Sequence, residues 1–137
     1  SGPSYITIAM KELTKAEEQI MRVLWELGEA YVKDIVERLP RPKPAYNTVS
    51  TIIRILERKG FVGHEAFGKT HRYRPLVAKE RYTHDYLRNF VRNYFGDSYQ
   101  DLVHFFAKDR NLSVAELEDI LKILRDEIRK HKADDHG

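Results

Sequence analysis

The sequence has no cysteine and no long apolar run. The lack of cysteine excludes disulfides and thiolate metal sites. No apolar segment approaches the roughly 20 residues that a membrane-spanning helix needs. The first ten residues also lack the basic start and apolar core of a signal peptide. From these absences we expect a cytoplasmic protein.

Catalytic signatures are missing as well. There is no cysteine nucleophile, no G-x-S-x-G elbow and no H-E-x-x-H helix. The six histidines are scattered along the chain, and a zinc site built from His84, His104 and carboxylates is a less favoured alternative to exposed structural histidines. We expect no enzyme, no cofactor, no bound metal and no small-molecule substrate.

One motif, in contrast, is typical of nucleotide-binding enzymes. Residues Gly63 to Thr70 match the phosphate-loop pattern G-x-x-x-x-G-K-[ST] letter for letter. A true phosphate loop follows a buried strand and opens a helix that holds the anion. Here the following residues are His-Arg-Tyr-Arg-Pro, which are typical of a strand, and no parallel βαβ pattern surrounds them. Nucleotide hydrolysis is therefore disfavoured.

Charge is unevenly distributed. The net charge of the chain is +3, but the segment from Pro40 to Arg74 holds eight basic and two acidic residues, a net +6, so the remainder sums to −3. A basic middle between mildly acidic ends favours one local surface for a polyanion. On charge alone, a solvated loop with a chance excess of basic residues remains the alternative.

Apolar residues recur at helical spacing in the first third of the chain. A capping box at Thr14 and Glu17 opens a first helix, which Gly28 ends. A shorter helix follows from Val32 to Leu39. The next five residues, Pro40-Arg41-Pro42-Lys43-Pro44, cannot continue a helix, and they predict a stiff, exposed, basic connector.

A third helix is predicted from Tyr46 to Lys59, with Val49, Ile52, Ile53 and Leu56 as its buried stripe. Small polar side chains on its other face are short enough for the backbone to approach base edges. An N-terminal turn rich in capping residues is the alternative. That other face carries Asn47, Thr48, Ser50, Thr51, Arg54 and Arg58.

A hairpin completes the first domain. Residues 61–67 predict one strand, Gly68-Lys69-Thr70 a turn, and His71-Arg72-Tyr73-Arg74 a second strand closed by Pro75. Three short helices and a basic hairpin follow the order of a winged helix-turn-helix, whose hairpin tip grips the DNA backbone. The residues that we expect to contact double-stranded DNA are Lys43, Tyr46, Asn47, Thr48, Ser50, Thr51, Arg54, Lys69, His71 and Arg72.

The last third of the chain predicts a helix from Lys79 to Phe95, a second segment after Gly96, and a last helix that a capping box at Ser113 and Glu116 opens. All three carry aromatic or apolar stripes. About 55 residues of this kind do not easily close a core alone, so we expect a second copy to cover the stripes. Helices folded back on the first domain in a monomer are the alternative. The expected dimer interface comprises Tyr86, Leu87, Phe90, Val91, Tyr94, Phe95, Leu102, Phe106, Leu117, Ile120, Leu121 and Leu124.

The predicted fold is therefore mainly α with a small β-hairpin wing. The organisation is an N-terminal tail (1–10), a winged helix-turn-helix DNA-binding domain (11–77), a helical dimerisation domain (78–131) and a charged C-terminal tail (132–137). Two linked heads would read a palindromic operator with half-sites one or more helical turns apart. The rival interpretation is a winged-helix adaptor dimer that binds protein and not specific DNA; Arg54 and Arg58 argue against it.

The sequence resembles the BlaI/MecI family of penicillinase and methicillin-resistance repressors from about Leu13 to Ile128. The resemblance rests on the order and spacing of Leu13-Thr14-x-x-Glu17-x-x-Ile20-Met21-x-x-Leu24-Trp25, Asn47-Thr48-Val49-x-Thr51, Leu56-x-x-Lys59-Gly60, Gly68-Lys69-x-x-x-Tyr73-x-Pro75-Leu76, Leu102-Val103 and Leu112-Ser113.

The resemblance implies a dimeric repressor with Thr48, Ser50 and Thr51 in the major groove. It also implies inactivation when a membrane-spanning sensor protease, directly or indirectly, causes cleavage in the dimerisation domain. The family's scissile Asn-Phe step falls at Phe105-Phe106 when counted back from Leu112. The Phe is present there and the Asn is not, which puts sensitivity to the same protease in doubt.

Overall fold

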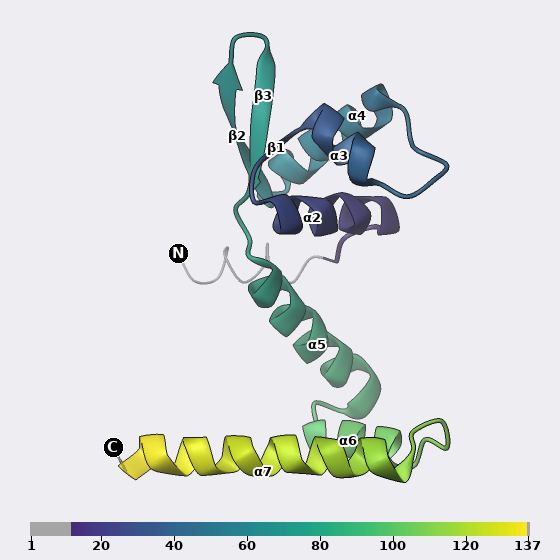
Figure 1. Cartoon of the computed structure of the whole chain (residues 1–137), viewed down its shortest axis with the longest axis vertical. Helices are drawn as coiled ribbons and strands as arrows, with labels where there is room; N and C mark the ends of the chain where they lie inside the picture. Colours follow the sequence, from purple (N-terminus) through teal and green to yellow (C-terminus); the bar gives the residue numbers. More distant parts are fainter. Residues whose placement is uncertain (1–11, 137) are drawn as a thin grey trace. The chain divides into compact units, whose positions relative to one another are not determined.

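The computed structural model describes residues 12–136, so the predicted N-terminal tail, residues 1–10, lies outside the described residues. The chain divides into two compact units, Ser1–Phe90 and Val91–Gly137. Figure 1 gives the element labels used below. None of the described helices combines the length and the apolar character that crossing a lipid bilayer requires.

The first unit contains three short helices and a hairpin, as the sequence predicts. Figure 1 shows α2, α3 and α4 gathered together and the β2–β3 hairpin projecting from them. The elements in order are α2 (Lys15–Leu27), β1 (Ala30–Tyr31), α3 (Val32–Arg38), α4 (Tyr46–Arg58), β2 (Val62–Phe67), β3 (Thr70–Pro75) and the start of α5 (Lys79–Phe95).

The predicted capping box opens α2. The Glu17 backbone N–H donates to Thr14 Oγ1, and the Thr14 N–H donates to Glu17 Oε1 at 2.8 Å. The helix ends at Gly28, whose φ of 80° lies in the left-handed region that favours glycine. Glu17 is nevertheless buried, and Lys59 at the end of α4 donates to both of its carboxylate oxygens at 2.8 and 2.9 Å. This ion pair joins the start of α2 to the end of α4.

The core of the first unit forms where the apolar stripes of the three helices meet the base of the hairpin. Met21, Leu24, Ile35, Val49 and Ile53 lie at the centre and are almost completely buried. Leu24, Ile35, Val49 and Ile53 belong to the apolar stripes that the sequence predicts, whereas Met21 lies beside its stripe. Core packing therefore fixes which face of α4 is turned to solvent.

The small sheet has three antiparallel strands in the order β1-β3-β2. The sequence predicts the hairpin but not β1, which is only two residues long and so shows no periodicity. Ala30 pairs with Tyr73 and Tyr31 with Arg72, while His64 pairs with Tyr73 across the hairpin. The strand after α2 thus fixes the base of β3 against the helices.

The start of α5 is fixed to the first unit. Trp25 Nε1 donates to the Val77 carbonyl oxygen at 2.8 Å. The Leu13 N–H donates to the Tyr82 hydroxyl at 3.0 Å, and the buried Tyr82 ring packs against Trp25 and Phe61. The compact unit therefore continues beyond residue 77, where the sequence predicts the end of the winged domain.

The second unit contains the end of α5, α6 (Tyr99–Ala107) and α7 (Val114–His136). The capping box predicted at Ser113 and Glu116 is present, with both reciprocal hydrogen bonds formed. The α7 helix continues to His136 and takes in nearly all of residues 132–137, the predicted tail. A winged helix followed by a helical region is thus the fold of this chain.

Candidate nucleic-acid interface

The third predicted helix, α4, separates its faces sharply. Val49, Ile53 and Leu56 are completely buried. The opposite face exposes most of the polar residues that the sequence assigns to DNA: Asn47, Thr48, Thr51 and Arg54. The Thr51 hydroxyl donates to the Asn47 carbonyl oxygen at 2.9 Å, so its oxygen keeps both lone pairs as acceptors.

Ser50 is placed differently from its neighbours. Its relative exposure is only 9%, and its hydroxyl oxygen accepts a hydrogen bond from the Arg54 guanidinium at 3.1 Å. At 100° per residue, position 50 falls at the edge of the buried stripe and not at the centre of the exposed face. The structure therefore gives Ser50 a role in holding Arg54, and its contact with DNA stays a prediction.

Lys43 lies in the connector before α4, and its ammonium group is already engaged. It donates to the carbonyl oxygen of Val36 at 3.3 Å and to that of Glu37. These carbonyls belong to the last turn of α3, where a cation satisfies acceptors that the helix leaves open. To contact DNA as predicted, the Lys43 ammonium group would have to bind the DNA as well as these carbonyl oxygens.

The hairpin presents two chemically different faces. His64, His71 and Tyr73 share one face, because directly opposed residues of an antiparallel pair point to the same side. The His64 and His71 rings stack with centroids 4.1 Å apart, and His64 Nδ1 lies 2.6 Å from Glu57 Oε2 on α4. This face of the hairpin is turned toward α4.

Arg72 belongs to the other face of the hairpin. Its guanidinium lies 4.6 Å from the centre of the Phe67 ring, and Arg72 Nε is 3.5 Å from Glu29 Oε2. Both partners of this ion pair are partly exposed, so its net contribution is at most about 1 kcal/mol. A DNA phosphate would therefore replace Glu29 at little cost. The tip residues Lys69 and Thr70 are exposed.

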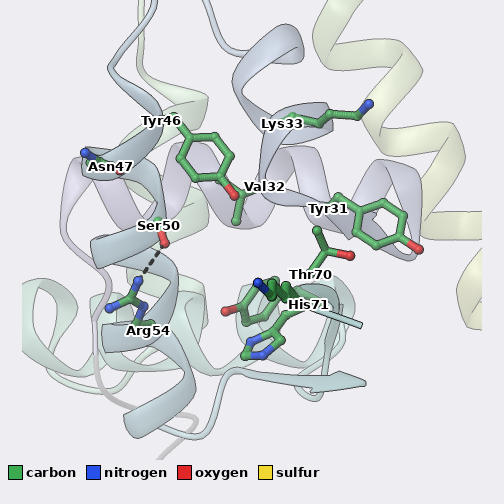
Figure 2. A pocket seen from close by; sticks show the side chains of 11 residues that line it. Tyr31, Val32, Lys33, Tyr46, Asn47, Ser50, Arg54, Thr70 and His71 are labelled. Atoms are coloured by element: carbon green, nitrogen blue, oxygen red, sulfur yellow. Dashed lines mark hydrogen bonds between the residues drawn. The ribbon is translucent and has the colours of Figure 1, made fainter. Parts of the chain in front are cut away.

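An open pocket of about 550 Å³ lies between α4, the start of α3 and the hairpin, within the first unit (Figure 2). Tyr73 forms part of its lining, and burial raises the pKa of this phenol, with the Glu57 carboxylate raising it further. The hydroxyl thus keeps its proton near neutral pH. The lining residues are Tyr31, Val32, Lys33, Tyr46, Asn47, Ser50, Arg54, Lys69, Thr70, His71 and Tyr73.

Six of these lining residues were predicted as DNA contacts: Tyr46, Asn47, Ser50, Arg54, Lys69 and His71. The structure brings them together along one side of α4 and the facing hairpin, whereas Thr48 and Thr51 lie outside the pocket. The sequence does not predict the other five lining residues as site residues: Tyr31, Val32, Lys33, Thr70 and Tyr73. The sequence could have indicated Tyr73, because it lies two residues after His71 and therefore on the same face of the predicted strand. No local pattern places the start of α3 beside the pocket.

Six of the twelve predicted dimer-interface residues are exposed in the single chain, and all but one of the others are half-buried. Tyr94 is 73% and Leu124 47% exposed, whereas Val91 is completely buried. Leu102, Phe106, Leu117 and Ile120 are half-buried. Within the described residues of the second unit, Val91 is the one buried apolar side chain. Phe105 is 68% exposed, and the predicted cleavage step lies in the last turn of α6.

Comparison with known proteins gives a match over most of the chain. A family model described as penicillinase repressor matches residues 13–126. The methicillin resistance regulatory protein MecI of Staphylococcus aureus (strain N315) is 27% identical over 114 residues, 82% of this chain and 93% of that protein. The penicillinase repressor of Bacillus licheniformis is 20% identical over 122 residues, 88% of this chain and 95% of that protein.

Among solved structures, this chain is similar to the DNA-binding domain of the repressor BlaI. The TM-score is 0.45 and the identity 21%, over 51% of this chain and 87% of that one. A structure of the CopR repressor matches with a TM-score of 0.42 and 36% identity, over 48% of this chain and 97% of that one.

Proposed function

This chain belongs to the penicillinase repressor family and is accordingly a transcriptional repressor and not an enzyme, and we propose that it acts as a homodimer on a palindromic DNA operator. Each first unit reads one half-site with the exposed face of α4 and holds the backbone with the β2–β3 hairpin. The second unit pairs with its copy.

The arrangement of α4 and the hairpin supports the DNA-binding part of the proposal. The exposed face of α4 offers short polar side chains, which allow close approach to base edges in the major groove. Cations on the hairpin and on α4 flank this face, and such cations fix register on the phosphate backbone. Among the described residues, no carboxylate lines the pocket between them.

The described residues of the second unit form almost no core, and this supports dimerisation. Burial of a single apolar side chain gives a helical unit too little free energy to offset the conformational entropy that it loses on folding. Leu121, Leu124 and Ile128 form a stripe on α7 and are each about half exposed. A second copy that buries these stripes is the simplest way to complete the core.

Dimerisation also explains how the protein would be released from DNA. Two linked heads bind a palindrome far more tightly than one, so any event that separates them weakens repression. Phe105 is exposed and Phe106 half-buried, and the step between them lies near the C-terminal end of α6, where carbonyl groups lack helical partners and the turn frays. We propose this turn as the site at which a protease would separate the heads, directly or indirectly controlled by a membrane sensor.

Selection from random duplex DNA with the purified chain, read by sequencing at two salt concentrations, tests the proposal. We expect a palindrome to be enriched and the affinity to fall steeply with salt, because each neutralised phosphate releases counterions. Recovery of no motif would contradict sequence-specific binding and favour the adaptor interpretation. Recovery of a single half-site would contradict the dimer.

Thr51 provides a test of the base-reading face. Thr51→Val keeps the shape of the side chain but removes its oxygen acceptor, so we expect selectivity at one position of each half-site to fall by about 1–3 kcal/mol. The measurement is competition binding with duplexes that carry every base at that position. Thr83→Val, an exposed threonine on α5, is the matched control and should change nothing.

Arg72 tests the hairpin. We expect Arg72→Ala to weaken binding to all duplexes by the same factor and to reduce the slope of log affinity against log salt by about 1. The matched control is Arg22→Ala, which also removes an exposed, ion-paired arginine but on α2. A changed sequence preference with an unchanged salt slope would show that Arg72 reads bases and not phosphate.

A further inference from the structure

The pocket lies along one edge of the base-reading face of α4 and shares Asn47 and Arg54 with it. Tyr46, Ser50 and Arg54 line it at intervals of four residues, which places them in one row along the side of α4 that faces the hairpin. Figure 2 shows this row on one wall, with Thr70 and His71 of the hairpin opposite. Thr51, the outward-facing threonine, is not part of the lining.

The pocket combines aromatic walls with a cationic edge. Val32 and Tyr73 are buried apolar surfaces, and the rings of Tyr46 and His71 add planar faces. Arg54 and Lys69 supply positive charge. Apolar and aromatic walls with a few convergent polar groups are typical of small-molecule sites, and 550 Å³ lies within their usual volume range.

Several donors in the pocket are available. Within the described part of the chain, the side chains of Lys69, Tyr46 and Asn47 form no hydrogen bond or ion pair. Arg54 uses one terminal nitrogen for Ser50, which orients the guanidinium and leaves its other donors open. Oriented cationic donors facing a pocket that no described carboxylate lines favour an anion.

We propose that this pocket binds a free mononucleotide, with the base against the tyrosine and histidine rings and the phosphate at Arg54 and Lys69. A DNA strand shares the phosphate chemistry, but its bases are paired and stacked in the duplex and cannot fill the aromatic part. Because the pocket lies between the two elements that we assign to DNA, nucleotide and operator would exclude each other. That exclusion rests on the proposed function; the pocket itself does not.

Titration of the full chain with AMP, adenosine and inorganic phosphate, followed by NMR, tests the inference. We expect AMP to shift the resonances of Tyr46, His71 and Tyr73 saturably, with a dissociation constant of about 1 mM or lower. Adenosine and phosphate should each bind at least about tenfold more weakly, because each supplies only part of the contacts. Arg54→Gln should weaken AMP binding by about tenfold. Arg58→Gln, an exposed arginine of α4 outside the pocket, should leave it unchanged.

Three results would overturn the inference. The first is the absence of saturable shifts with AMP. The second is phosphate binding as tightly as AMP, which would assign the site to the DNA backbone alone. The third is an equal loss of AMP affinity in Arg54→Gln and Arg58→Gln. AMP should also displace a labelled operator duplex, and failure to do so would overturn the exclusion. An operator bound without any AMP binding would leave the proposed function intact; AMP binding without a recovered operator would leave the pocket intact.

Discussion

Replacing both Leu121 and Leu124 by aspartate is expected to turn the proposed dimer into monomers and to weaken operator binding by about 100-fold or more. Both side chains are exposed in the single chain, at 45% and 47%, so each monomer tolerates the change. A charge buried between two copies has no partner and is strongly disfavoured. Linked heads gain about 10²–10⁴ in affinity over single ones, and that gain would be lost.

The matched control for this variant is Ile123→Asp. Ile123 is 61% exposed on the same helix, but at 100° per residue it lies about 130° from the centre of the stripe. Sedimentation at micromolar concentration and anisotropy of a labelled palindrome measure the two effects, and circular dichroism verifies the helix content. If Ile123→Asp dissociated the protein and the double variant did not, the interface would lie on another face of α7.

Lys59→Met is expected to lower the free energy of unfolding by about 2 kcal/mol at neutral pH. The substitution leaves the Glu17 carboxylate buried with only the Thr14 N–H as a donor. Breaking a fully buried pair costs about 3–5 kcal/mol. We expect less here because the Lys59 side chain is 30% exposed and water reaches that side of the pair.

The effect should depend on pH with a definite sign. Burial raises the pKa of Glu17, but hydrogen bonds from Lys59 and the Thr14 backbone outweigh it and hold the pKa below its ordinary value of 4.5. A depressed pKa stabilises the fold above the unfolded value, and this contribution is lost as the pH falls through the folded one. The difference between wild type and Lys59→Met should therefore shrink below pH 4.5.

Urea unfolding at pH 7 and pH 3, followed by circular dichroism, measures this difference. Lys132→Met, an exposed lysine on α7, is the control and should have little effect at either pH. A Lys59→Met effect as large at pH 3 as at pH 7 would contradict the assignment. It would show that packing of the lysine stem, and not the charge pair, stabilises the contact between α2 and α4.

Local signals in the sequence predict most of the fold. The boxes at Thr14 and Ser113 and the bounds of α5 follow from residues a few positions apart, because caps and periodicity are local. The stripe of α4 correctly separates Val49 and Ile53 from Asn47 and Thr51. The exposed face of a helix can thus be predicted once its buried face is known.

Tertiary contacts account for what the sequence did not predict. The pair Glu17–Lys59 spans 42 residues, and β1 exists only because β3 offers its edge. The sequence assigns Ser50 to the exposed face because serine is polar, but Ser50 lies at the edge of the stripe and holds Arg54 through a hydrogen bond. The sequence likewise does not predict the pocket wall at the start of α3, because that wall depends on how α3 packs on α4.

The contact between Trp25 and the Val77 carbonyl gives the protein a built-in optical reporter. The chain has a single tryptophan, and its indole is held by a hydrogen bond and packs against Tyr82. Its emission therefore originates in the first unit alone, whereas helical ellipticity is summed over both. Comparing the two signals during unfolding would show, without any label, whether the units melt together or one after the other.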